Sequence, residues 1–229
     1  MTAHLSNPQA VLWDMDGTLI DSEPYWIAAE TELASRYDVP WSHEDGLQFV
    51  GNPLPVSARV LQERGVALSE DEIIGYLLMR VREQVVANVP WQADARALLN
   101  ATVSAGIPCA LVTMSYTSLA QALVAAAPDA FSVIVTGDRV TRGKPDPEAF
   151  LTAADELGVD ITRCVAFEDS PAGVASAWTS GARTVGIRRL IPIEQRDGLS
   201  RVQSLEGWDV DTVRRIAAGD VIDELGDSV

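Results

Sequence analysis

Five short runs rich in Val, Ile and Leu recur along the chain, and helix-like segments separate the later ones. The apolar runs cover residues 10–14, 108–113, 132–136, 163–168 and 183–187, and the helical patterns between them cover 118–127, 147–157 and 171–180. Strands that alternate with helices are typical of right-handed crossovers within a parallel sheet. The alternation predicts an α/β fold with a Rossmann-like, doubly wound parallel sheet as its core.

The interval between the first two strands breaks this rhythm. It spans roughly ninety residues, whereas one crossover helix needs only about a dozen. Helical patterns occupy 25–37, 43–50, 56–64 and 70–86, and Ser69 with Glu72 forms a capping-box pattern that opens the last of them. We expect an inserted all-helical cap domain over residues 23–89, with hinges near 21–24 and 89–91. The α/β core then comprises residues 1–22 and 90–229, and its tail contains a helix-like stretch at 208–218.

The first apolar run leads directly into two acids, Asp14 and Asp16, followed by Gly17. Open α/β sheets bind their ligands at the carboxyl ends of strands. Two carboxylates one residue apart can hold a divalent cation and still present an oxygen as a nucleophile. An ordinary Asp-Gly turn at a strand end is the alternative for this segment taken alone.

Three further groups follow later strands. Thr113, with the backbone amides of Met114 and its neighbours, offers donors to an anionic oxygen, although strand-ending hydroxyls more often cap the next helix. Lys144, in a Gly-Lys-Pro segment, is the only lysine of the chain, so a compact ammonium is indicated where arginine serves elsewhere. Glu168 and Asp169 end the fourth run. Four acids at neighbouring strand ends repel one another unless a cation joins them, and an all-oxygen ligand set favours magnesium over zinc.

Charge and composition exclude several classes of protein. Seventeen basic and thirty-three acidic residues give a formal net charge of −16, which opposes binding to nucleic acid. No apolar stretch approaches the ~20 residues of a membrane span, and the amino terminus has no basic segment followed by an apolar run. We expect a cytoplasmic protein without nucleic-acid or membrane partners. Cys109 and Cys164 lie beside strands, where core packing is the expected role.

The order of these four motifs resembles the haloacid dehalogenase superfamily, in the branch with a small helical cap inserted after the first motif. The resemblance implies that Asp14 attacks phosphorus to form an aspartyl-phosphate and that Asp16 is the general acid and base. It implies magnesium held by Asp14, the backbone carbonyl of Asp16 and Asp169, with Glu168 binding directly or through water. Thr113, Met114 and Lys144 would take the phosphoryl oxygens.

Asp16 and the residues of the cap exclude some of the activities that occur in this superfamily. Dehalogenases of the superfamily lack an acid at the position of Asp16, and phosphonate cleavage uses a cap lysine that this chain does not have. We expect a magnesium-dependent phosphatase acting on a small phosphorylated metabolite, with a sugar phosphate favoured. A β-phosphoglucomutase-like phosphomutase is the alternative, although Trp26 stands near the position where those enzymes carry a histidine on the first cap helix. A non-enzymatic phosphometabolite-binding protein is a third possibility. Trp26, Asn52 and Arg59 are the cap candidates for substrate contact.

Overall fold

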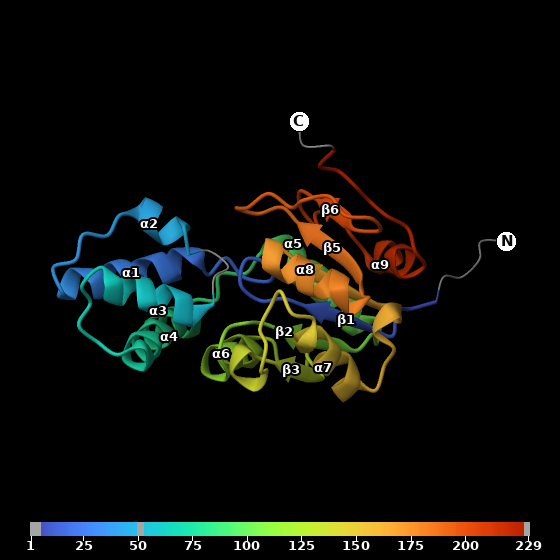
Figure 1. The fold of residues 1–229 in the computed structure, drawn as a ribbon. Helices are drawn as coiled ribbons and strands as arrows, with labels where there is room; N and C mark the ends of the chain where they lie inside the picture. Colours follow the sequence, from blue (N-terminus) through green and yellow to red (C-terminus); the bar gives the residue numbers. More distant parts are fainter. Residues whose placement is uncertain (1–5, 50–52, 227–229) are drawn as a thin grey trace.

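One parallel sheet forms the centre of the protein. The structure is a computed structural model and describes residues 6–49 and 53–226. Its strands lie in the order β3-β2-β1-β4-β5-β6 (Figure 1). The predicted doubly wound α/β core is confirmed, and β6 is a strand that the sequence pattern did not reveal. The strands are β1 (Ala10–Trp13), β2 (Cys109–Val112), β3 (Val133–Val135), β4 (Cys164–Glu168), β5 (Arg183–Ile187) and β6 (Ser200–Val202).

Strand β1 lies at the point where the order of the sheet reverses. It pairs in parallel with β2 on one side and β4 on the other, so that Trp13 lies opposite both Leu111 and Phe167. Ligands of open α/β sheets bind outside the carboxyl ends of strands at such a reversal. The residues that follow β1, β2 and β4 therefore share one crevice.

Helices cover both faces of the sheet. On one face, α7 (Glu148–Leu157) and α8 (Pro171–Ser180) pack over Leu12, Val112 and Ala166. On the other, α5 (Ala93–Ser104), α6 (Thr117–Ala126) and α9 (Val210–Ala217) belong to the cluster around Trp13. Two 3-10 turns, η1 (Gly137–Arg139) and η2 (Ile161–Arg163), precede α7 and β4. The sequence analysis did not identify α5. Both cysteines are buried and free, as expected.

The described part of the segment between β1 and α5 contains helices and no strand. These are α1 (Glu23–Arg36), α2 (His43–Leu47), α3 (Leu54–Glu63) and α4 (Glu70–Ala87), which form a separate lobe at the left of Figure 1. All four were predicted, and the predicted end of α2 at residue 50 lies outside the described residues. The expected capping box is present, because Ser69 accepts from the Glu72 amide at 3.3 Å and Glu72 accepts from the Ser69 amide at 2.8 Å. The boundaries of a cap domain at 23 and 89 stay a prediction.

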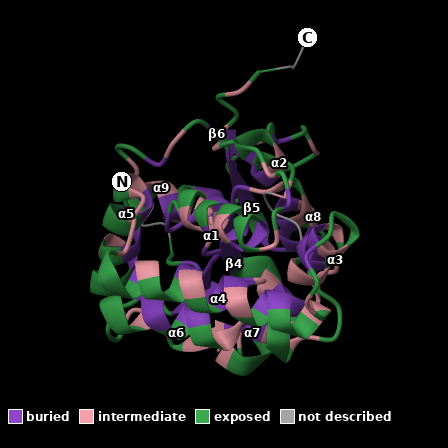
Figure 2. Cartoon of the chain, turned by 90° about the vertical axis from the view of Figure 1, so that its left-hand side faces the viewer, coloured by how far each residue is buried: buried purple, intermediate pink, exposed green. Residues whose placement is uncertain are grey.

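Apolar stripes hold this lobe together. Leu33 of α1, Leu61 of α3 and Leu77 and Val81 of α4 are buried against one another, and Figure 2 shows buried and exposed residues alternating along α4. Helix α4 also packs against α6, so the lobe contacts the sheet domain through α6 as well as through the chain connections. No helix among the described residues has the length and apolarity needed to cross a bilayer.

The tail after β5 is part of the folded structure. Helix α9 confirms the predicted 208–218 helix with slightly shorter bounds. Arg201 of β6 is buried, donates to Asp223 at 2.7 Å and to the Gly226 carbonyl at 2.7 Å, and so ties the last described residues to the sheet.

Candidate active site

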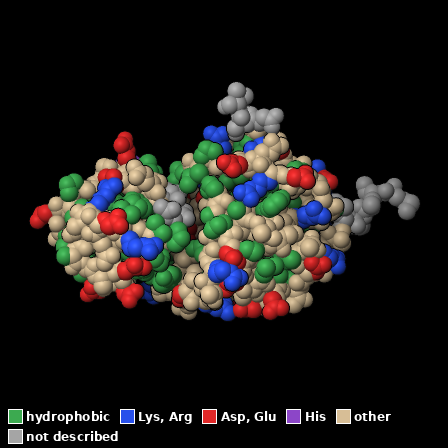
Figure 3. Space-filling model, viewed as in Figure 1, with side chains coloured by type: hydrophobic (Ala, Val, Ile, Leu, Met, Phe, Trp, Pro, Cys, Tyr) green, Lys and Arg blue, Asp and Glu red, His purple; other side chains and the backbone are tan. Residues whose placement is uncertain are grey.

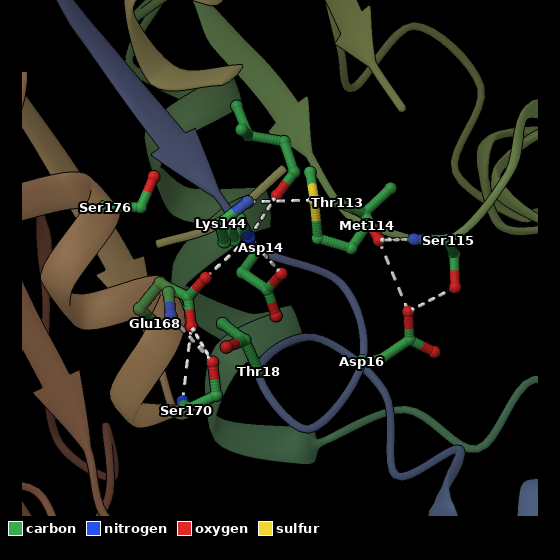
Figure 4. Close-up of polar contacts among 12 residues, drawn as sticks. Asp14, Asp16, Thr18, Thr113, Met114, Ser115, Lys144, Glu168, Ser170 and Ser176 are labelled. Carbon is green, nitrogen blue, oxygen red and sulfur yellow. Dashed lines mark hydrogen bonds and ion pairs between the residues drawn. The ribbon is translucent and has the colours of Figure 1, made fainter. Parts of the chain in front are cut away.

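The predicted core motifs meet at the carboxyl edge of the sheet. Asp14 follows β1, Thr113 follows β2 and Asp169 follows β4, and these three strands are neighbours. Lys144 reaches the same edge from the loop before α7 (Figure 4). Sequence spacing alone does not bring residues 14, 113, 144 and 169 together; the strand order does.

Lys144 lies between two carboxylates. Its Nζ donates to Asp14 Oδ1 at 2.6 Å, to Glu168 Oε1 at 2.5 Å and to the Val112 carbonyl at 2.9 Å. These contacts use all three N–H donors of the ammonium. The Lys144 side chain is 5% exposed, and its charge also lies 5.1 Å from the centre of the Phe150 ring. The only lysine of the chain is therefore a buried counter-ion of the predicted nucleophile.

One ammonium does not neutralise the acids around it. Oxygens of Asp14, Glu168 and Asp169 lie within 4.8 Å of one another, and all three residues are buried. Burial raises the pKa of Asp14 to about 7, reinforced by the charge of Glu168 and opposed by Lys144. Burial and the charge of Asp14 raise the pKa of Asp169 well above its usual range. The pKa of Lys144 is raised, because the charges of Asp14 and Glu168 outweigh the lowering effect of burial.

This cluster suits a divalent cation. Three carboxylates against one ammonium leave a surplus of two negative charges in a buried place, and such a surplus needs protons or a cation. Carboxylate oxygens are the donors that magnesium prefers. Asp14, Glu168 and Asp169 thus have the charge and chemistry of a magnesium site. The carboxylate of Asp16 is not one of this group, and the expected contribution of Asp16 is through its backbone carbonyl.

The carboxylate of Asp16 points to a different set of donors. Its Oδ2 accepts from Ser115 Oγ at 2.7 Å and Thr113 Oγ1 at 3.3 Å, and its Oδ1 accepts from Ser22 Oγ at 2.5 Å and Trp26 Nε1 at 3.4 Å. Figure 4 shows Asp16 set apart from the Lys144 cluster, next to Ser115. The two acids of the first motif therefore have separate surroundings, as two separate chemical roles require.

Two glycines permit the close approach of the acids to the backbone. Gly17 has a φ of +87°, and a Cβ there would lie 2.0 Å from Asp169 Oδ2. A Cβ on Gly173, in the first turn of α8, would lie 1.8 Å from Glu168 Oε1. Neither position can accept a side chain unless an acid moves.

The site opens into a cavity between the sheet edge and the lobe of α1–α4, with a volume of about 950 Å³ including the part open to solvent. Figure 3 shows the surface notched between these two parts of the molecule. Met114 lines the cavity and accepts a hydrogen bond at Sδ from the Lys144 amide at 3.3 Å. The residues on the core side are Asp14, Asp16, Thr113, Met114, Ser115, Lys144, Asp169, Ser170, Ala172 and Ile191.

The three residues of the cap that were predicted to contact substrate differ in their positions. Trp26 lines the cavity. Arg59 is exposed and is not among the described residues of the lining, because α3 turns its neighbours Ser57 and Ala58 inward and successive helical residues point about 100° apart. Asn52 lies outside the described residues.

Sequence reasoning missed several residues of the cap wall. The described lining there comprises Glu23, Trp26, Glu30, Gly46, Phe49, Pro53, Leu54 and Ser57. Glu23 and Glu30 lie seven residues apart on α1, which is the spacing of one helix face. This seven-residue spacing indicates that Glu23 and Glu30 share one face of α1, but the sequence does not show which face of α1 is turned toward the sheet. The Ser22 and Ser115 contacts to Asp16 carried no such signal.

Known proteins are similar to this chain in sequence and in fold. The sequence model described as haloacid dehalogenase-like hydrolase matches residues 8–181. The chain is 32% identical to hexitol phosphatase A of Escherichia coli over 92% of this chain and 96% of that protein. It is 29% identical to the fructose-1-phosphate phosphatase YqaB of Escherichia coli over 79% and 96% of the two chains.

A solved structure of CbbY from Rhodobacter sphaeroides in complex with phosphate is similar as well. It superimposes with a TM-score of 0.77 at 26% identity, over 87% of this chain and 95% of that one. The family match covers most of the chain and includes all four motifs, so this chain belongs to the haloacid dehalogenase-like hydrolases.

Proposed function

We propose that the protein is a magnesium-dependent phosphatase that hydrolyses a small phosphomonoester, with a sugar phosphate as the favoured substrate, through an aspartyl-phosphate on Asp14. The observation that carries the proposal is the buried Asp14–Lys144–Glu168 cluster, whose Asp14 and Lys144 line the same cavity as Asp16 between the sheet edge and the lobe of α1–α4. The phosphatase names of the two relatives support it, as does the phosphate in the similar CbbY structure.

The residues divide the reaction between them. Asp14 forms a bond to phosphorus while the bond to the ester oxygen breaks, and Asp16 delivers a proton to that leaving oxygen. In the second half, Asp16 takes a proton from water as the water oxygen attacks phosphorus and releases Asp14. Ser115 and Thr113 hold the Asp16 carboxylate in position for both transfers. Lys144 fixes the orientation of Asp14 and supplies a positive charge at the phosphoryl oxygens.

Asp14, Asp169 and Glu168, with the backbone carbonyl of Asp16, would hold the magnesium. When bound, the ion reduces the repulsion between an anionic nucleophile and an anionic phosphoryl group. A bound cation would compensate the surplus negative charge of the cluster and would let a protein of net charge −16 bind an anionic substrate. The absence of nucleic-acid partners and the cytoplasmic location stay predictions from the sequence.

Chromogenic phosphoester turnover tests the proposal. We expect magnesium-dependent release of phosphate by the wild-type protein and a loss of at least about 10³-fold in kcat for Asp14→Asn, because the amide cannot act as the nucleophile. Asp197→Asn is the matched control, since Asp197 is exposed and outside the cavity lining. Wild-type velocity in Asp14→Asn would overturn the mechanism. Isomerisation of a hexose phosphate that depends on a bisphosphate activator would instead establish the mutase alternative, and phosphate binding without turnover would establish a binding protein.

A further inference from the structure

A buried acid of α1 lies in the cap wall of the cavity, and one of its carboxyl oxygens has no partner among the described residues. Glu30 of α1 is 4% exposed, and its Oε2 accepts no hydrogen bond from any described residue. Buried polar atoms are almost always paired, because an unpaired one loses its hydrogen bonds to water without replacement. An unpaired carboxyl oxygen in a substrate cavity is therefore available to form a hydrogen bond with a bound substrate.

No basic side chain of the described residues pairs with Glu30. A Cβ on Gly46 would lie 3.3 Å from Glu30 Oε2, so the carboxyl group faces the bare backbone of another residue that lines the cavity. Glu23 lies on the same face of α1, and its charge adds to burial in raising the pKa of Glu30 to about 8. Burial and the charges of Asp16 and Asp21 raise the pKa of Glu23 to about 7.

The rest of the described cavity lining is also poor in positive charge. Among the described lining residues, Lys144 is the one cation, and its donors already serve Asp14, Glu168 and a backbone carbonyl. The cap wall contributes Glu23 and Glu30 and no described basic side chain. Among the described lining residues, positive charge therefore lies only at the core end of the cavity, and the charged groups of the cap end are carboxyl groups.

We propose that Glu30 is a specificity-determining residue, which hydrogen-bonds a hydroxyl or amino group on the part of the substrate distant from its phosphate. Together with Glu23 it selects hydroxyl-rich monophosphates. It rejects substrates that carry a second phosphate or a carboxylate at that end, because the described cap wall offers no positive charge to pair with a buried second anion. This inference rests on the proposed phosphatase function and deepens it by naming the substrate class.

Comparison of two kinds of substrate isolates the role of Glu30. A hydroxylated monophosphate such as glucose 6-phosphate presents donors to the cap wall, whereas p-nitrophenyl phosphate has no hydroxyl or amino group there. We expect Glu30→Met to lower kcat/KM for the best hydroxylated monophosphate of a panel by roughly 10-fold to 100-fold. The value for p-nitrophenyl phosphate should stay within about 2-fold. Glu63→Gln is the matched control, because Glu63 is an exposed acid of the same lobe.

Each outcome decides the matter. An equal loss on both substrates, or no loss on either, would overturn the role of Glu30. Glucosamine 6-phosphate, assayed in parallel, distinguishes an amino from a hydroxyl donor. Should Glu30→Met fail to fold, the wild-type protein provides the test, because it must prefer glucose 6-phosphate to 2-phosphoglycolate; the opposite order would overturn the inference. Failure of the wild type to hydrolyse p-nitrophenyl phosphate would overturn the proposed function itself, which keeps the two failures distinct.

Discussion

Replacing Lys144 by Met removes the single positive charge from a cluster of buried acids and keeps most of the side-chain volume. Lys144 contacts Asp14 and Glu168 at 2.6 and 2.5 Å, and all three side chains are less than one tenth exposed. Loss of one partner of a buried ion pair costs about 3–5 kcal/mol, because the remaining charges stay buried without compensation. At about 2–4 °C per kcal/mol for a chain of this size, we expect Tm to fall by roughly 6–20 °C in the absence of metal.

The pH dependence of this loss gives it a distinctive signature. A buried acid whose pKa is raised in the folded state binds its proton more tightly there than in the unfolded chain, so it destabilises the fold as pH rises. Asp14 already has a pKa of about 7 beside Lys144, and removal of the ammonium shifts it further in the same direction. The Tm deficit of Lys144→Met should therefore be larger at pH 8 than at pH 5, and magnesium should reduce it at pH 8.

Thermal unfolding followed by circular dichroism measures these quantities, in chelator at both pH values and with added magnesium at pH 8. Arg142→Met is the control, because Arg142 pairs with Asp146 at 2.7 Å but its side chain is 66% exposed; we expect a change within about 1 kcal/mol. A Lys144→Met protein with the wild-type Tm at pH 8 would refute the role of Lys144 as a buried counter-ion.

Lys144→Arg should also lose most activity, since a longer planar group replaces a compact ammonium in a packed site, whereas Arg142→Lys should remain active.

Three further outcomes follow from the structure. Gly173→Ala should lower kcat by at least about 10²-fold, because its Cβ would lie 1.8 Å from Glu168 Oε1 and displace that acid; steady-state kinetics at wild-type levels would contradict the close approach. Chelation should abolish phosphatase activity and added magnesium should restore it, as the carboxylate cluster requires; activity that persists after exhaustive dialysis against chelator would contradict the metal site. Ser69→Ala should cost about 1 kcal/mol through loss of the α4 cap, with a Tm lower by about 2–4 °C and kcat unchanged; an unaltered Tm would show that the capping box adds nothing to stability.

The sequence by itself determined the local chemistry of the site. Asp14, Glu168 and Asp169 each stand within or directly after an apolar run that is a strand, and Asp16 follows two residues after Asp14. Strand patterns depend on neighbouring residues. The capping box at Ser69 was readable for the same reason. Family resemblance then supplied the roles of these residues, and the alternation of strands and helices supplied the class of fold.

Only the tertiary structure shows which residues of distant segments are in contact and which charges they bury. The burial of Lys144 between Asp14 and Glu168, and the contacts of Ser22 and Ser115 with Asp16, join residues up to 130 positions apart. Glu30 has the sequence context of an ordinary surface acid on an amphipathic helix, and it became a cavity residue only because α1 turns that face toward the sheet edge. Burial and charge compensation are properties of the packed chain, so neither could be deduced from local pattern.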